Sequence, residues 1–326
     1  MAKSRNQKLK LPCLIQILKE KTDEDHGLSA EELIRELARY DISAERKSIY
    51  DDIALLQDCF GMVIEHDRAK GYRLMEQDLE LPELKLLVDA IQSSKFISLS
   101  KSEELIRKLK KLTSEHHAKE LQRQVTVKNR IKSMNNTTIY SIDTIHNAIL
   151  NDRQITFQYW SWTPNKEQAA RHSGKKYQVS PWMLLWDDEY YYLIAYDEEN
   201  AQIRHYRVDR MRTVCETKET RKGRTEFEQI DVAEYSRGVF GMFGGNITHV
   251  TFRCKNSMAD VVLDRFGKDV MMTPLDEGFQ FHADINVSPQ FFGWVASFGE
   301  EIKIVSPPSV ADQFKEHLQN ALKQYQ

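Results

Sequence analysis

Residues 43–56, with the sequence SAERKSIYDDIALL, decide how the first part of the chain is interpreted. Ile49, Ile53 and Leu56 recur at helical spacing, so one face of a helix is expected to be buried. Ser43 is expected to cap this helix, because its hydroxyl can accept from an N–H group of the first turn. Four side chains on the opposite face can donate to phosphate oxygens or base edges: Arg46, Lys47, Ser48 and Tyr50. A solvated amphipathic helix would show the same pattern, so the neighbouring segments matter.

The segments on either side predict a winged helix-turn-helix. Upstream, Ser29 and Glu32 have the spacing of a capping box, which marks the start of a short helix. Downstream, residues 62–66 and 72–74 are predicted to form two strands joined by a turn. This hairpin would be the wing. Its tip carries two side chains that could reach the phosphate backbone, Arg68 and Lys70.

Composition limits the classes of protein that fit. The chain has 326 residues, of which 41% are hydrophobic, enough for two or three domains. The net charge of −3 means that any surface for nucleic acid must be local. Four scattered cysteines without a C-x-x-C pair suggest a reducing compartment and neither a disulfide framework nor a zinc site. No apolar run approaches the ~20 residues of a membrane span, and no signal peptide is evident. We therefore expect a cytoplasmic protein with no membrane partner.

The N-terminus is basic, and the connector that follows the wing is expected to be helical. Lys3, Arg5, Lys8 and Lys10 form a basic arm, which is also common as a solubilising terminus.

Two helices are expected in the connector, one over residues 79–97 and one starting at a capping box over residues 100–103. They would pair two protomers, or simply pack on the first domain.

The chain shows no sign of catalysis. His116 and His117 lie on a polar helix and are expected to have no partners at ligand spacing. There is no G-x-S-x-G motif and no phosphate-binding loop. We expect no enzyme activity, no catalytic residue, no metal and no cofactor.

The middle of the chain is rich in short strands. Residues 153–160, 176–186, 190–196 and 203–212 have β-type composition, which suggests a small barrel. The period of a strand would place Arg204, Arg210 and Arg212 on one face and Arg207 on the other. Asp209 is expected to pair with a basic neighbour.

These strands carry candidates for a ligand site. Guanidinium groups bind phosphate through two N–H donors, and aromatic rings stack on nucleobases. The alternative role of each arginine is a surface salt bridge, and that of each tyrosine is packing in the core of the barrel. The candidates for ligand binding are Tyr159, Ser180, Tyr192, Arg204, His205, Arg207 and Arg210.

The last part of the chain alternates strands and helices. Residues 240–245 are rich in glycine and are interpreted as a linker. Residues 247–305 then show the order β-α-β-β-α-β, followed by a helix over residues 308–325.

Several motifs resemble those of one protein family. The run S-x-x-R-K-S-I-Y-x-D-I from Ser43, followed by K-G-Y-R-L at 70–74, is similar to the winged helix-turn-helix of bacterial regulators with a WYL domain. The runs SPWML, YYLIAYD and RHYRVDRM, which start at Ser180, Tyr191 and Arg204, resemble the WYL domain itself. Tyrosine replaces the tryptophan of W-Y-L. Family members often have a basic residue where this chain has Asp51, so weak binding by a monomer is expected.

The resemblance implies an α+β multidomain fold. Its parts would be a winged helix-turn-helix at 5–75, a helical linker for dimerisation at 76–137, an Sm/SH3-like β-barrel at 138–225, and a ferredoxin-like extension at 226–326. The implied function is a transcriptional regulator that binds a double-stranded DNA operator as a homodimer, with half-sites about 34–36 Å apart. A nucleotide or single-stranded nucleic acid would be the effector. The alternative is a non-catalytic adaptor or regulatory subunit that binds nucleic acid through the barrel and whose winged helix contacts proteins.

Overall fold

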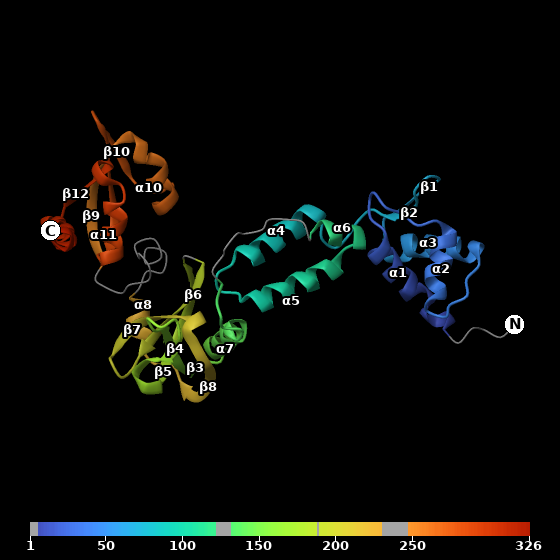
Figure 1. Ribbon diagram of the computed structural model, residues 1–326, viewed down its shortest axis with the longest axis horizontal. Coiled ribbons are helices and arrows are strands. Elements are labelled where there is room, and N and C mark those ends of the chain that lie inside the picture. Colours follow the sequence, from blue (N-terminus) through green and yellow to red (C-terminus); the bar gives the residue numbers. More distant parts are fainter. Residues whose placement is uncertain (1–5, 122–131, 188, 230–246) are drawn as a thin grey trace. The chain divides into compact units, whose positions relative to one another are not determined.

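The computed structural model describes residues 6–121, 132–187, 189–229 and 247–326. The chain is a mixed α+β protein that divides into two compact units, residues 1–136 and 137–326 (Figure 1). The predicted linker at residues 240–245 lies outside the described residues. None of the described helices combines the length and the apolar character that crossing a bilayer requires.

The N-terminal unit begins with three helices and a hairpin. Its elements are η1 (Gln7–Leu9), α1 (Lys10–Lys21), α2 (Ala30–Ala38), α3 (Arg46–Phe60), β1 (Ile64–Asp67), β2 (Gly71–Leu74), α4 (Leu81–Ser93), α5 (Leu99–Leu109), η2 (Lys110–Leu112) and α6 (Glu115–Glu120). Ile49, Ile53 and Leu56 are all buried, as the helical spacing predicts. They pack with Leu14 and Leu18 of α1 in one core.

Two of the three predicted helix starts differ from the structure. The capping box is confirmed at α2, where Ser29 accepts from the Glu32 N–H and Glu32 accepts from the Ser29 N–H. Ser43 does not cap α3, because the first helical hydrogen bond runs from Ile49 to the Glu45 carbonyl. For α5 the cap is Ser98, whose hydroxyl accepts from Lys101 N, so the predicted Ser100 lies inside the helix.

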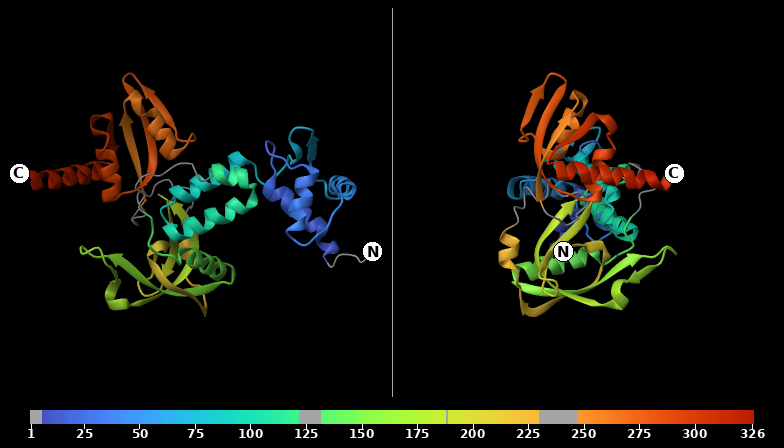
Figure 2. Two further views of the ribbon diagram at one scale, coloured as in Figure 1. Left: turned by 45° about the vertical axis from the view of Figure 1, so that its right-hand side comes forward. Right: turned by 90° about the vertical axis from the view of Figure 1, so that its left-hand side faces the viewer.

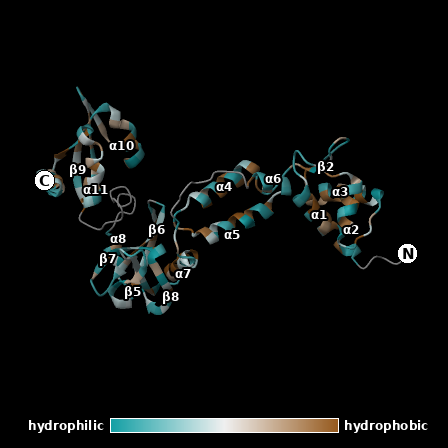
Figure 3. Cartoon of the chain, in the orientation of Figure 1, coloured by the Kyte–Doolittle hydropathy of each residue, from teal (hydrophilic) through white to brown (hydrophobic). Residues whose placement is uncertain are grey.

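Helices α4 and α5 lie side by side in both sets of views (Figures 1 and 2). Residues 22–29 connect α1 to α2. Apolar and polar segments alternate along both helices (Figure 3). Leu84 and Val88 of α4 pack with Leu121, which follows α6. Leu28 lies beside strand β2 of the hairpin, because it pairs with Tyr72 in an isolated antiparallel bridge. The segment 22–28 therefore touches the hairpin.

The C-terminal unit contains two separate sheets. The first half comprises α7 (Thr138–Leu150), β3 (Arg153–Trp162), β4 (Gln168–Ala170), η3 (Arg171–Gly174), β5 (Lys176–Asp187), β6 (Tyr190–Asp197), β7 (Gln202–Arg207), η4 (Val208–Arg210), β8 (Met211–Thr220) and α8 (Arg224–Glu228). Five strands follow the order β4-β3-β5-β6-β7, and β8 pairs with β3. Phe157 and Leu193 are fully buried at the centre of this sheet, against Ile145 of α7.

The strand predicted over residues 203–212 is interrupted. A single 3-10 turn, η4, separates β7 from β8. Strand periodicity therefore ends at Arg207, and the predicted placement of Arg204, Arg210 and Arg212 on one face of a continuous strand is wrong. Asp209 instead folds back onto Arg207, which confirms the expected pairing with a basic neighbour.

The second half has the predicted alternation. It comprises β9 (Ile247–Cys254), η5 (Asn256–Met258), α10 (Ala259–Phe266), β10 (Met272–Leu275), β11 (Gly278–Asn286), α11 (Pro289–Ala296), η6 (Gly299–Glu301), β12 (Ile302–Ser306), α12 (Pro308–Leu322) and η7 (Lys323–Tyr325). The strand order is β10-β11-β9-β12, and all pairs are antiparallel. Phe252 and Phe281 pack against Phe266 and Phe291 of the helices, which leaves the alternate residues of these strands outside that core.

Candidate nucleic-acid and effector sites

The first turn of α3 is open and basic. Arg46 and Lys47 are exposed, and Tyr50 is 42% exposed. Arg46 donates to the Tyr50 hydroxyl, which holds both side chains on one side of the helix. The N-cap Glu45 makes no side-chain hydrogen bond, and no acidic residue lies in the first turn. Free N–H groups and the helix dipole make such an end attractive to phosphate.

A groove of about 690 Å³ lies between this turn and the hairpin. Tyr50 and His66 both approach Tyr72, with ring centroids 6.4 Å and 4.5 Å away. Arg68 and Lys70 are exposed at the tip of the hairpin, where Lys70 lies 3.5 Å from Asp25. The groove thus brings predicted DNA contacts of α3 together with those of the hairpin.

Ser48 lies differently from its three neighbours. It is half-buried, and both its hydroxyl and its carbonyl accept from Lys10. Lys10 is only 5% exposed and also pairs with Asp52. Lys10 is therefore part of the packing between α1 and α3, and its assignment to a solvated basic arm is wrong. Lys3 and Arg5 lie outside the described residues. Asp51, beside Asp52, is exposed on α3.

In the C-terminal unit, Arg207 has defined partners. Its Nε and Nη2 donate to the two carboxylate oxygens of Asp209 at 3.0 Å and 2.9 Å. Its guanidinium also lies 3.5 Å from the ring centroid of Tyr190. Burial disfavours the charged form of Arg207, but the Asp209 carboxylate outweighs it and raises the pKa. Two of its donors are thus already used within the chain.

Tyr159 lies next to three arginines. It is 8% exposed, and its hydroxyl accepts from the Arg207 backbone N–H at 3.1 Å. Burial raises the pKa of Tyr159, while that hydrogen bond and the charge of Arg210 act in the opposite direction. The Arg171 guanidinium lies 6.0 Å from the Tyr159 ring centroid. Among the described ion pairs, none includes Arg171 or Arg210, so both retain donors for an anion.

The other predicted ligand contacts are more enclosed. Ser180 is 1% exposed and accepts from the Lys222 N–H, and Tyr192 is 8% exposed in a small apolar cluster. The Nε of Arg204 lies 3.3 Å from a carboxylate oxygen of the buried Asp197. His205 is half-buried on β7.

Sequence reasoning did not single out an aromatic cluster beside β5. The Trp182 ring stacks on Phe227 at 5.3 Å, and the Arg221 guanidinium lies 4.2 Å from the Trp182 centroid. Trp182 belongs to the quoted SPWML run, but its partners come from residues 221–228, which carry no recognisable pattern. Arg171 was missed for a similar reason, since it lies in the turn η3 rather than on a strand.

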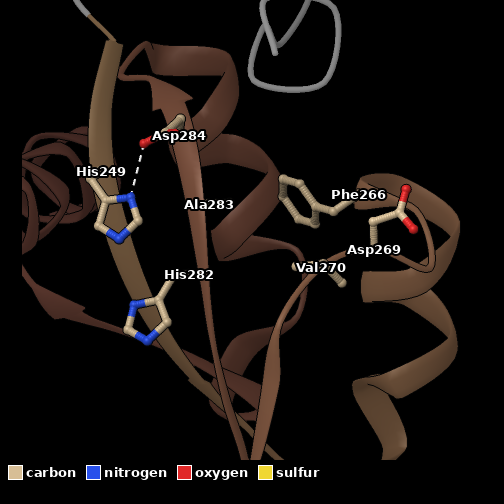
Figure 4. A pocket seen from close by; sticks show the side chains of 7 residues that line it. All are labelled: His249, Phe266, Asp269, Val270, His282, Ala283 and Asp284. Carbon is tan, nitrogen blue, oxygen red and sulfur yellow. Dashed lines mark hydrogen bonds and ion pairs between the residues drawn. The ribbon is translucent and has the colours of Figure 1, made fainter. Parts of the chain in front are cut away.

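A shallow pocket of about 160 Å³ lies at the sheet of β9 and β11 (Figure 4). His249 and His282 stack with ring centroids 5.5 Å apart. His249 Nδ1 lies 2.9 Å from Asp284, and His282 Nδ1 lies 2.9 Å from the Thr251 hydroxyl. These partners explain the arrangement of both rings without a ligand.

Comparison with known proteins identifies two domains. The model of the WYL domain matches residues 141–216, and the model of the WCX domain matches residues 246–322. No curated protein sequence matches the chain. One similar solved structure is proteasome accessory factor B/C (PafBC) of Arthrobacter aurescens, with 17% identity and a TM-score of 0.28 over 99% of this chain and 50% of that one. A CRISPR Cas-related protein has 13% identity and a TM-score of 0.40 over 90% of this chain and 77% of that one. The chain spans half the length of the first of these structures.

Proposed function

We propose that the chain, which carries a WYL domain and a WCX domain, is a non-catalytic transcriptional regulator that binds double-stranded DNA through α3 and the β1–β2 hairpin. The observation that carries this proposal is the open first turn of α3, where Arg46, Lys47 and Tyr50 are exposed beside a groove. In this proposal residues 5–75 form a winged helix-turn-helix and residues 76–137 a dimerisation linker. The WYL domain is an Sm/SH3-like barrel at 138–225, and the ferredoxin-like extension follows at 226–326.

The residues would have distinct roles. Arg46, Lys47 and Tyr50 would contact bases and phosphates in the major groove, and Arg68 and Lys70 would contact phosphates from the wing. Ser48 would act indirectly, because its hydroxyl holds Lys10 against α3. Asp51 would repel phosphate, so a homodimer that doubles the contacts would bind far more tightly than one protomer.

The effector site would lie around Tyr159. Arg171 and Arg210 would receive the phosphate of a nucleotide or a single-stranded nucleic acid, and Arg207 would hold Tyr190 in place. Tyr192, Arg204, His205 and Ser180 would support the strands on which these residues lie. Four free thiols are consistent with action in the reducing cytoplasm.

The test starts from genomic DNA because the operator is unknown. Full-length protein is used to select genomic fragments, and the double variant Arg46→Ala, Lys47→Ala is compared with the wild type. We expect the wild type to enrich fragments that share an inverted repeat. We expect the double variant to bind them about 10–100-fold more weakly, with a shallower dependence on salt.

A matched control removes the same charge elsewhere. The double variant Arg253→Ala, Lys303→Ala changes two exposed basic residues of β9 and β12, outside the proposed DNA, effector and dimer contacts. It should bind the selected fragments like the wild type. If both double variants lose affinity equally, the effect is one of net charge and α3 is not the DNA-reading helix. Light scattering of the free protein tests the dimer directly.

One observation favours a second candidate, an adaptor whose winged helix contacts a protein. The exposed carboxylate of Asp51 lies on the same helix as the basic residues, which is unfavourable for DNA. The variant Asp51→Asn distinguishes a helix that binds DNA from one that contacts a protein. It should raise affinity for duplex DNA if the helix faces phosphates, and it should leave DNA affinity unchanged if the helix faces a protein.

A further inference from the structure

The loop before α2 meets α6 at a cluster of three potential metal ligands. Asp23, Glu24 and His117 each offer one ligand atom, and these atoms all lie within 4.8 Å of one another. His117 Nε2 is 3.4 Å from a carboxylate oxygen of Glu24 and 3.8 Å from one of Asp23. The expectation that His117 has no partners at ligand spacing is therefore wrong. Its partners are more than ninety residues away in the sequence, so no local motif reveals them.

The cluster is buried on one side and open on the other. The Asp23 side chain is fully buried and that of His117 is 6% exposed, whereas the Glu24 side chain is 48% exposed. An ion could therefore enter from the side of Glu24 and still be shielded from water on the opposite side. One oxygen of the buried Asp23 carboxylate also accepts from the backbone N–H groups of Asp25 and His26, as a buried charge requires.

A second layer of hydrogen bonds orients the two buried ligands. One Asp23 oxygen accepts from His26 Nδ1 at 2.7 Å, and the other accepts from the Ser114 hydroxyl at 2.5 Å. His117 Nδ1 lies 3.3 Å from the Thr113 hydroxyl, which turns Nε2 toward the carboxylates. Metal sites are commonly built this way, with an outer partner fixing the free nitrogen of a histidine ligand.

The spacing of the atoms suits a small ion better than direct hydrogen bonds. Tetrahedral bonds of about 2.1 Å place two ligand atoms about 3.4 Å apart. The separations from His117 Nε2, 3.4 Å and 3.8 Å, lie near this value. A good hydrogen bond from nitrogen to oxygen is shorter, about 2.9–3.0 Å.

We propose that Asp23, Glu24 and His117 bind a divalent transition-metal ion of the zinc class, with water in the fourth position. One imidazole and two carboxylates match the ligands that such ions take, whereas Mg²⁺ and Ca²⁺ prefer oxygen ligands alone. The ion would join the loop of residues 22–28 to α6. None of its ligands is among the proposed DNA or effector contacts, so zinc binding can be tested without reference to the proposed function.

The experiment measures bound zinc in full-length protein. Protein treated with a chelator is dialysed against Zn²⁺, and the metal content is measured by mass spectrometry. We expect about one ion per chain for the wild type, and a rise in Tm on the order of 5 °C when Zn²⁺ is added. Asp23→Asn and His117→Ala should lose the ion and the rise in Tm.

Three further variants keep the outcome decisive if those two fail to fold. Glu24→Gln changes an exposed ligand and Thr113→Val an outer partner, and each should weaken zinc binding about 10-fold or more without unfolding the protein. His249→Ala removes a histidine that is also paired with an aspartate, and it should bind zinc like the wild type. The proposal is overturned if the wild type takes up no zinc. It is also overturned if Glu24→Gln and Thr113→Val bind zinc as tightly as His249→Ala does, because the contacts would then be hydrogen bonds only.

Discussion

Lys10 of α1 forms an ion pair with Asp52 of α3, and both side chains are largely buried, with 6% and 18% exposure. The lysine also donates to Ser48, one turn earlier on α3. This pair fixes the proposed DNA-reading helix on the first helix of the chain. A buried charge that loses its partner costs much more than an exposed one, because it is not resolvated by water.

Breaking this pair should therefore destabilise the N-terminal unit. Asp52→Asn leaves Lys10 without a carboxylate, and we expect a loss of about 3 kcal/mol in the free energy of unfolding in urea. The exposed neighbour provides the control, since Asp51→Asn should change stability by less than about 0.5 kcal/mol. Equal effects of the two variants would mean that the Lys10 pair adds nothing beyond a surface charge.

A second prediction concerns Gly27, which lies against the hairpin. A Cβ atom at this position would lie 2.3 Å from the Lys70 carbonyl oxygen and 2.9 Å from that of Tyr72. Backbone atoms cannot move aside as a flexible side chain can, so Gly27→Ala should cost about 2 kcal/mol and displace the hairpin. Gly293→Ala in α11 meets nothing within 4 Å and should be neutral or slightly stabilising. Thermal unfolding of the two variants checks this, and similar Tm values would contradict it.

The acid stability of α2 should depend on Glu32. Hydrogen bonds from the Ser29 N–H and hydroxyl lower the pKa of Glu32 in the folded state. A lowered pKa adds stability above the unfolded value of about 4.3, and this contribution disappears as the pH falls through the folded pKa. Because Glu32 is partly exposed, we expect Glu32→Gln to cost only about 0.5 kcal/mol at pH 7 and almost nothing once the pH is below the folded pKa of Glu32. Glu31→Gln, which removes none of these hydrogen bonds, should not show the same change between the two pH values.

The four thiols should differ in reactivity. Cys254 is 2% exposed, and burial raises its pKa to about 12. The thiolate is the reactive form, so Cys254 should resist alkylation at pH 8. Cys59 and Cys215 are exposed and should react first. Peptide mapping after iodoacetamide treatment checks this order, with urea-unfolded protein as the reference in which all four react. Rapid labelling of Cys254 in native protein would show that β9 opens readily.

Local patterns predicted the elements of this fold well. The stripe of Ile49, Ile53 and Leu56 and the box of Ser29 and Glu32 depend only on neighbours within two turns, and the structure confirms them. Boundaries were less accurate. Ser43 and Ser100 both have a capping side chain, but the first helical hydrogen bonds form at Glu45 and Ser98. Several residues can cap a helix, and tertiary packing selects among them.

The sites were harder to predict than the elements, because their partners come from distant segments. Lys10 was interpreted from its basic neighbours, yet its partners are on α3. The partners of His117 lie in the first loop. Residues 203–212, which carry the arginines, were interpreted as one strand. The turn η4 interrupts this strand and brings Asp209 back to Arg207. Side chains from different elements meet only in the folded chain, so their chemistry is not visible in spacing alone.

The bridge between Leu28 and Tyr72 joins the end of the loop that carries Asp23 to strand β2 of the hairpin. Only four residues, 24–27, separate the buried carboxylate from the bridge, which is too short a segment to absorb a shift without passing it on. A shift of Asp23 would therefore reach β2 through Leu28. Occupancy of the proposed zinc site would in this way bear on the position of the strand that carries the wing.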